Sequence, residues 1–206
     1  MNIGIDFDDV ITPSIETFLE WYNKNNNTNI HMKHYMEYKT QMPHIKTLEE
    51  YCQLWWDFYA TEEHHAMIPK ENVIEILQKL NKKHDLHIIT SRDEKIQKHT
   101  YKWIENNLKG IFKEIVHIEY FYDENKNEYS HLTKADICKK LGIQIFIDDS
   151  ISNLLSCVNE NIKCILFQPN TFYDKEELSK VPSTIIKVNS WKEIEKEIEK
   201  LEKNQA

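Results

Sequence analysis

The first twelve residues, MNIGIDFDDVIT, restrict the possible folds more than any other stretch of this chain. Ile3 and Ile5 are β-branched, and the apolar run around them is typical of a short buried strand. The run ends in three carboxylates, those of Asp6, Asp8 and Asp9. Because like charges so close together repel, burying them costs several kcal/mol unless a cation or a hydrogen-bond donor compensates. The stretch is therefore either an exposed acidic turn or a site for a divalent metal and a nucleophile.

The segment that follows is predicted to be mostly helical. Residues 15–67 contain an amphipathic pattern over 15–22 and an Asn- and Lys-rich loop over 23–29. An aromatic helix begins after Thr47, which forms a capping-box pattern with Glu50. The first strand is thus followed by a small helical insertion.

After a turn marked by His64, His65 and Pro69, the pattern changes to alternating helices and strands. Five further strands are predicted, at residues 85–90, 115–120, 144–147, 163–167 and 184–188. This order with short connections is typical of an α/β protein in which helices cover both faces of a parallel sheet.

Composition excludes several classes of protein. The formal net charge of −8 argues against a broad nucleic-acid-binding surface, but a small phosphorylated ligand is compatible with it. The four cysteines show no CxxC spacing, so neither a disulfide framework nor a zinc site is expected, and free thiols fit a reducing cytoplasm. No apolar run approaches the length of a membrane span. We therefore expect a cytoplasmic protein that binds neither membranes nor nucleic acids stably.

Reactive side chains follow three of the predicted strands. In an open parallel sheet the ligand binds outside the carboxyl ends of the strands, where the strand order reverses. Carboxylates suit Mg²⁺ there, one aspartate can act as a nucleophile, and a second can protonate the leaving oxygen and then activate water. Hydroxyls and a lysine suit a phosphoryl group. The residues concerned are Asp6 and Asp8 after the first strand, Thr90 and Ser91 after the second, Asp148 and Asp149 after the fourth, and Lys134 in the helix before the fourth.

Four motifs in this chain resemble, in the same order, those of the haloacid dehalogenase superfamily of phosphatases. They are residues 6–11 (DFDDVI), residues 88–91 (IITS), Lys134 and residues 145–149 (IFIDD). The resemblance implies a Rossmann-like parallel sheet flanked by helices, formed by residues 1–14 and 68–206. It implies that residues 15–67 are a small helical cap inserted after the first strand, and that Mg²⁺ is the cofactor.

The resemblance also implies a role for each site residue. Asp6 would be the nucleophile and a Mg²⁺ ligand. Asp8 would be the general acid and base and would offer its backbone carbonyl to the metal. Asp148 would complete the metal shell, supported by Asp149. The substrate phosphate would be bound by Thr90, Ser91, Arg92 and Lys134.

Two residues of the predicted site have alternatives. Arg92 is the one arginine in a lysine-rich chain, which suggests that lysine would not serve in its place. The alternative is a surface ion pair with Asp93 or Glu94, which would contribute little. Asp9 occupies a position that is often glycine in the superfamily, so it either faces solvent or influences which leaving groups are accepted.

A narrower resemblance concerns the substrate. The Thr90–Ser91 pair, the Ile-Asp-Asp ending and the compact insertion resemble the 5′(3′)-deoxyribonucleotidases and related bacterial nucleotidases, which implies a nucleoside monophosphate. A sugar phosphate or another small phosphoester is the alternative. A non-catalytic protein that binds phosphate for regulation is a rival of another class, and the intact Asp6–Asp8 pair argues against it.

The insertion is rich in aromatic side chains, and the sequence leaves their role open. They could stack on a nucleobase, or they could pack together as the core of the insertion. These side chains are Trp55, Trp56, Phe58 and Tyr59. Association into a homodimer is also left open.

Overall fold

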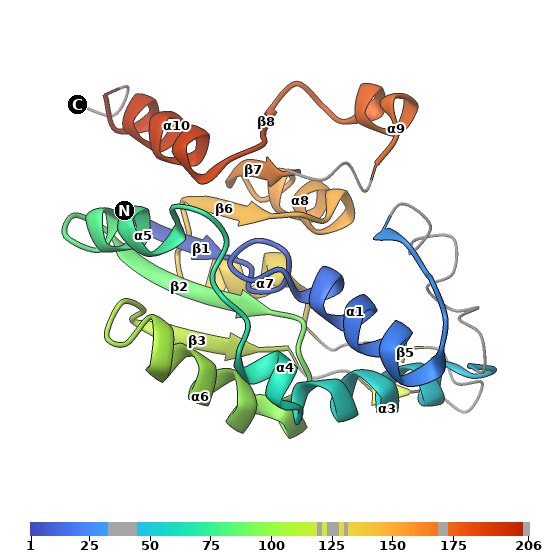
Figure 1. The fold of residues 1–206 in the computed structure, drawn as a ribbon. Helices are drawn as coiled ribbons and strands as arrows, with labels where there is room; N and C mark the ends of the chain where they lie inside the picture. Colours follow the sequence, from blue (N-terminus) through green and yellow to red (C-terminus); the bar gives the residue numbers. More distant parts are fainter. Residues whose placement is uncertain (33–44, 119–120, 123–127, 130–131, 169–172, 204–206) are drawn as a thin grey trace.

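The computed structural model describes residues 1–32, 45–118, 121–122, 128–129, 132–168 and 173–203. Its centre is a six-stranded parallel sheet with the strand order β3-β2-β1-β6-β7-β8 (Figure 1). The strands are β1 (Asn2–Ile5), β2 (Asp85–Thr90), β3 (Glu114–His117), β6 (Ile145–Asp148), β7 (Lys163–Phe167) and β8 (Ile185–Val188). The strand order reverses between β1 and β6, because the chain runs outward from β1 on one side and from β6 on the other. The predicted α/β architecture is confirmed.

Alternate residues of the central strands pack into two cores, one on each face of the sheet. Ile145 and Ile147 of β6 belong to the first core, whereas Phe146 between them belongs to the second. Gly4 of β1 permits close packing in the second core, since a Cβ there would lie 3.0 Å from the Phe146 ring. The first core includes side chains of α5 (Val73–Leu80), α6 (Gln97–Asn107) and α10 (Trp191–Lys203), and the second includes α7 (Lys134–Lys140) and α8 (Ile151–Val158).

Three helices between β1 and α5 in the chain contact one another, and we call them the inserted helices. They are α1 (Ser14–Asn26), α3 (Leu48–Tyr59) and α4 (Glu62–His65). The ring of Phe18 stacks on Trp55 at a centroid distance of 4.1 Å, and Phe58 lies edge-on to Phe18 at 5.5 Å. The predicted capping box at the start of α3 is confirmed by reciprocal bonds between Thr47 and Glu50.

Two local predictions were wrong. Residues 23–26 continue α1, because the amides of Asn25 and Asn26 donate to carbonyls one turn back and the helix ends only at Asn27, which has a φ of 52°. His64 and His65 lie in the short helix α4, which Thr61 caps, rather than in a turn.

Some described elements were not predicted. They are α9 (Lys175–Lys180) and the antiparallel pair of β4 (Phe121–Tyr122) and β5 (Glu128–Tyr129). A 3₁₀ turn at Glu94–Ile96 precedes α6. None of the helices in the described ranges is long and apolar enough to cross a membrane.

Two linkers flank the inserted helices: residues 6–13 follow β1, and residues 66–72 lead into α5. An indole N–H group holds each of them: Trp191 Nε1 donates to the carbonyl of Val10 at 3.0 Å, and Trp103 Nε1 donates to that of Met67 at 2.9 Å. A backbone hydrogen bond of 2.9 Å joins the two linkers. The segment that carries the first three aspartates is therefore anchored to the rest of the protein.

Candidate active site

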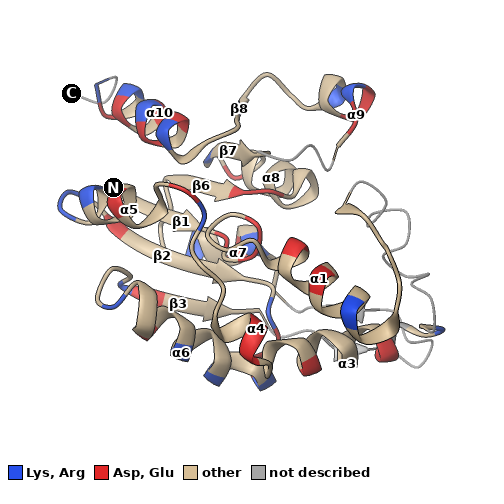
Figure 2. Cartoon of the chain, viewed as in Figure 1, with Lys and Arg blue, Asp and Glu red and all other residues tan. Residues whose placement is uncertain are grey.

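The carboxylates of Asp6, Asp148 and Asp149 meet at the edge of the sheet where the strand order reverses, and we call them the acidic triad. Strands β1 and β6 are neighbours, and the N–H of Asp6 continues their pairing by donating to Ile147 O at 2.9 Å. One oxygen from each carboxylate lies within 4.8 Å of the others. Figure 2 colours red the acidic positions in the segments where β1 and β6 end. The prediction that the two strand ends converge is confirmed for these residues.

Lys134 lies between two members of the triad. A capping box of Thr133 and Asp136 begins α7 at this residue. Its buried ammonium lies 2.8 Å from Oδ1 of Asp6 and 2.8 Å from Oδ2 of Asp148. Burial by itself would lower the pKa of Lys134, but the two carboxylates outweigh it and hold the pKa above its ordinary value. The side chain is therefore a permanent cation at neutral pH.

The triad carries more negative charge than Lys134 can neutralise. Burial raises the pKa of Asp6 to about 7, aided by Asp148 and Asp8 and opposed by Lys134. Burial, together with Asp148 and Asp6, also raises the pKa of Asp149 well above its ordinary value. Clustered carboxylate oxygens that repel one another in this way are the hard ligands that Mg²⁺ accepts. The residues present thus fit a divalent cation.

Further donors fix the orientation of Asp148. The N–H of Ser150 donates to Oδ1 at 2.7 Å, and the amide of Asn153 donates to Oδ2 at 3.1 Å. Asn153 follows Asp148 by just over one helical turn, in α8. The carboxylate is held on several sides, so its position does not depend on a ligand.

The carboxylate of Asp8 forms an ion pair with the guanidinium of Arg92. Arg92 Nε donates to Oδ2 at 2.9 Å, and Nη2 donates to Oδ1 at 2.7 Å. Burial raises the pKa of Asp8, but the guanidinium outweighs burial and the net pKa is below its ordinary value. Asp8 therefore has a different environment from Asp6, although the two residues are two positions apart.

Arg92 itself is buried, with 3% of its surface exposed. Its guanidinium lies over the rings of Phe7 and Tyr59, 4.3 and 4.4 Å from their centroids. Nη1 donates to Nε2 of His64 at 3.1 Å and to Oγ1 of Thr100 at 3.2 Å. The alternative of a surface ion pair is wrong, because the side chain is enclosed and its carboxylate partner is Asp8. Its expected contact with substrate phosphate stays a prediction.

Thr90 is the last residue of β2, and Ser91 follows it; β2 pairs with β1, the strand that precedes the first aspartates. Thr90 is buried, and its hydroxyl accepts a hydrogen bond from the N–H of Arg92 at 3.2 Å. Ser91 is exposed. Their proposed contacts with phosphate stay predictions.

Asp9 has a structural role that the sequence did not indicate. Its backbone is left-handed, with a φ of 56°, and its side chain is buried. The carboxylate accepts the N–H of Ile15 at 3.2 Å, in the first turn of α1. Burial raises its pKa to about 8, although Lys70 opposes the shift. Asp9 therefore does not face solvent: it ties the loop after β1 to the first inserted helix. The positive φ agrees with the frequent glycine at this position in the superfamily, since glycine is the residue that most readily adopts such a φ.

The aromatic side chains of the insertion are mostly engaged with one another. Trp55, Phe58 and Tyr59 pack together and against Phe18 or His64. Trp56 instead lies under the ammonium of Lys95, 4.5 Å from its ring centroid. Packing explains three of the four aromatic residues without a nucleobase.

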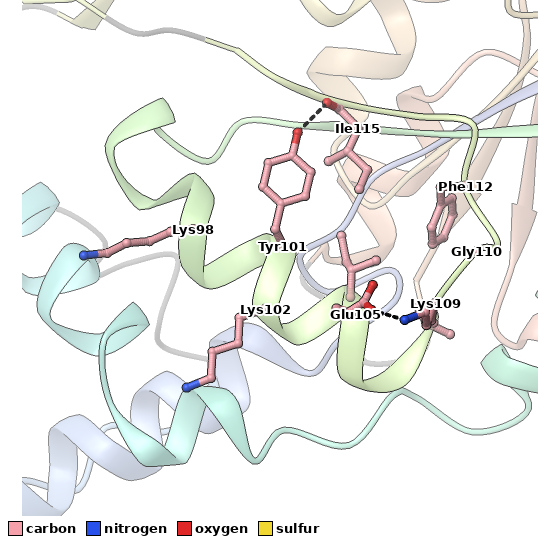
Figure 3. A pocket seen from close by; sticks show the side chains of 10 residues that line it. Lys98, Tyr101, Lys102, Glu105, Lys109, Gly110, Phe112 and Ile115 are labelled. Atoms are coloured by element: carbon pink, nitrogen blue, oxygen red, sulfur yellow. Dashed lines mark hydrogen bonds and ion pairs between the residues drawn. The ribbon is translucent and has the colours of Figure 1, made fainter.

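A separate cavity of about 520 Å³ lies between α6 and the segment that follows it (Figure 3). Tyr101, Phe112 and Ile115 line it, and the Tyr101 hydroxyl donates to the carbonyl of Ile115 at 3.4 Å. It shares no residue with the acidic triad or with Asp8 and Arg92.

Comparison with known proteins agrees with this geometry. The model of the family described as haloacid dehalogenase-like hydrolase matches residues 5–167. No curated protein sequence matches the chain significantly.

Among solved structures, a predicted phosphatase from Clostridium acetobutylicum is similar at 18% identity and a TM-score of 0.67, covering 97% of this chain and 98% of that one. A haloacid dehalogenase-like family hydrolase from Streptococcus pneumoniae is similar at 14% identity and a TM-score of 0.60, covering 90% and 92%. A superfamily hydrolase from Ehrlichia chaffeensis has 15% identity and a TM-score of 0.55, covering 97% and 96%. At these identities the similarity shows the fold.

Proposed function

This chain belongs to the haloacid dehalogenase-like hydrolase family, and from that membership and the site geometry we propose that it is a Mg²⁺-dependent phosphomonoesterase. The observation that carries the proposal is the position of Asp6. Its carboxylate is buried at the switch point of the sheet, within 2.8 Å of Lys134 and beside Asp148 and Asp149. A nucleophile, a fixed cation and a set of metal ligands therefore lie together where α/β proteins bind their ligands.

Asp6 is oriented for attack through one of its oxygens. Oδ1 accepts from Lys134 Nζ and from the N–H of Phe7, each at 2.8 Å, so we assign the attack to Oδ2. A bond forms from Oδ2 to phosphorus while the bond to the leaving oxygen breaks. Asp8 supplies the proton that the leaving oxygen takes, which requires that it first take up a proton although Arg92 holds its pKa below the ordinary value. Water then gives a proton to Asp8 and attacks phosphorus, which releases phosphate and restores Asp6.

The remaining residues would hold the metal and the phosphoryl group. Asp6, Asp148 and the backbone carbonyl of Asp8 would bind Mg²⁺, with Asp149 in support. When bound, the cation would offset charge that develops on the phosphoryl oxygens. Lys134 would act on the same charge, and Thr90 and Ser91 would donate hydrogen bonds to those oxygens.

We propose a nucleoside monophosphate as the substrate, because the Thr90–Ser91 pair and the Ile-Asp-Asp ending are similar to those of the deoxyribonucleotidases. Trp56 is our candidate for a base contact, since it is only partly buried and, among the described residues, lies under a lysine ammonium and contacts no other ring. A sugar phosphate remains the alternative.

Phosphate release from a panel of esters tests the proposal. The panel contains an aryl phosphate, 5′- and 3′-nucleoside monophosphates, sugar phosphates and short phosphorylated oligonucleotides, each with Mg²⁺ and with EDTA. We expect release with Mg²⁺, fastest from nucleoside monophosphates, and none from the Asp6→Asn variant. No release from any ester between about pH 5 and 8, where such acid–base pairs operate, would support the non-catalytic rival. Faster release from sugar phosphates than from nucleoside monophosphates would support the phosphatase activity and show that the proposed substrate is wrong.

A further inference from the structure

We propose that Arg92 is a positioning residue that orients the general acid Asp8 and links that orientation to the inserted helices. The inference rests on the proposed function, because it takes Asp8 to be the proton donor. It differs from our expectation for Arg92, which was a direct contact with the phosphoryl group.

The first step is the two-point contact between the side chains. A planar guanidinium that meets both oxygens of a carboxylate fixes its rotation as well as its distance. Here Nε and Nη2 of Arg92 meet Oδ2 and Oδ1 of Asp8 at 2.9 and 2.7 Å. A side chain that exchanges protons with a leaving oxygen and with water requires such control, since proton transfer depends on hydrogen-bond geometry. Arg92 acts here on the orientation of Asp8, whereas its charge favours the carboxylate form. Lysine could make only one of these contacts at a time.

The second step is that the other contacts of Arg92 hold it away from a phosphate. Nη1 already donates to His64 and Thr100, so four N–H bonds of the guanidinium are directed to protein atoms. Rings cover it on two sides, those of Phe7 and Tyr59. A residue bound in this way can act on the reaction through Asp8.

The third step is the origin of these contacts. Tyr59 belongs to α3 and His64 to α4, both inserted helices, whereas Asp8 and Phe7 belong to the loop after β1. His64 is fully buried, and its Nε2 faces a charged donor, so this nitrogen is an acceptor and the ring proton is on Nδ1. The same guanidinium therefore contacts the catalytic loop and the inserted helices, and a displacement of α3 and α4 changes the support of Asp8.

The leaving-group dependence of kcat/KM separates positioning from phosphate binding. The value of kcat/KM reports the steps up to and including formation of the phosphorylated Asp6. In that last step the leaving oxygen takes its proton. Dinitrophenolate leaves without a proton, whereas an alkoxide from a nucleoside or glycerol requires one. We expect Arg92→Met to lower kcat/KM about 100-fold for an alkyl phosphate and less than about 3-fold for 2,4-dinitrophenyl phosphate. Arg92→Lys should recover part of the loss.

Three controls make the result decisive. Lys98→Met removes an exposed cation nearby and should leave both rates unchanged. Tyr59→Leu should reduce kcat/KM for the alkyl phosphate selectively, because the ring over Arg92 is lost. Tyr59→Phe keeps the ring and should leave this value unchanged. Thermal unfolding of each variant shows that it is folded. If Arg92→Met does not fold, Arg92→Lys decides, because it retains the charge without the fork.

Each outcome bears on one conclusion. An equal loss for both esters would overturn the proposal and support a phosphate contact for Arg92. An unchanged kcat/KM for the alkyl phosphate in folded Arg92→Met would also overturn it. Absence of activity in the wild-type protein on every ester would instead refute the proposed function. An equal effect of Tyr59→Leu and Tyr59→Phe would remove the link to the inserted helices.

Discussion

The ammonium nitrogen of Lys134 lies 2.8 Å from Oδ1 of Asp6 and 2.8 Å from Oδ2 of Asp148. Both carboxylates are buried, and Asp149 adds a third beside them. One cation thus offsets three acidic groups in surroundings that solvate charge poorly. The electrostatic cost raises the pKa of Asp6 and Asp149, and it makes the stability of the protein sensitive to any change in this cluster.

Removal of the cation should therefore destabilise the protein and abolish catalysis. Lys134→Met should lower the free energy of unfolding by about 3 kcal/mol without Mg²⁺, because it leaves buried carboxylates unpaired. It should lower kcat/KM by a factor of about 100 or more. Urea denaturation and phosphate release measure the two effects. Lys140→Met, an exposed change in the same helix, is the control, and equal stability of the two variants would contradict the expectation.

Addition of Mg²⁺ should stabilise the wild-type protein through the acidic triad. At a Mg²⁺ concentration of 100 times Kd, the gain in unfolding free energy is about 2.7 kcal/mol. Asp149→Asn should raise the unfolding temperature of the metal-free protein, since it removes a carboxyl group whose ionisation the site disfavours, and should reduce the gain on adding Mg²⁺. The exposed Glu199→Gln should change neither quantity. Calorimetry with EDTA and with Mg²⁺ gives the unfolding temperature and its increase on adding Mg²⁺. An undiminished increase in Asp149→Asn would show that Asp149 takes no part in metal binding.

The stability of the protein should fall in mild acid because of His64. Burial, with Arg92, lowers the pKa of His64 to about 2. The unfolded chain takes up a proton near the ordinary pKa of about 6.5, and the folded protein does not. The stability from His64 is therefore fully present above that pKa and is lost as pH falls toward 2, by up to about 1.4 kcal/mol per pH unit.

The change His64→Gln isolates this contribution, because glutamine keeps an oxygen that can accept from Arg92. Unfolding in urea at pH 7 and at pH 5 should show a smaller loss of stability for the variant than for the wild type. His31→Gln, at an exposed position, is the control for removing an imidazole. If His64→Gln and the wild type lose stability in parallel, His64 is protonated in the folded protein.

The stabilities of variants at Asp9 should follow an order that two requirements set. The residue must adopt a φ of 56° and must accept the N–H of Ile15. Asn meets both requirements without a charge, so Asp9→Asn should be at least as stable as the wild type. Asp9→Ala should lose about 1–2 kcal/mol, as for a lost helix cap. Asp9→Gly should lose less than Asp9→Ala, since glycine tolerates the left-handed backbone. Urea unfolding at pH 7 ranks the variants by their free energy of unfolding. A higher stability of Asp9→Ala than of Asp9→Gly would contradict the argument from backbone strain.

Much of the fold was predictable because its signals are local. The period of apolar residues indicated β1, β2, β6 and β7, and the capping box of Thr47 and Glu50 indicated the start of α3. The errors were also local: asparagines that bond back to their own helix extend α1 to residue 26, against the usual preference of this residue for loops. The short α9 and the β4–β5 pair have too few residues for a periodic pattern to show.

The sequence by itself determined which side chains converge at the edge of the sheet. Residues at the carboxyl ends of neighbouring parallel strands must meet there, so Asp6 and Asp148 could be placed from the order of the strands, and the order of the motifs added Lys134. The tertiary structure alone decided how Arg92 and Asp9 are used. Arg92 meets a carboxylate 84 positions away, and Asp9 turns its side chain to a helix through an unusual φ. Neither contact leaves a periodic pattern in the chain, because each depends on the packing of the inserted helices against the loop after β1.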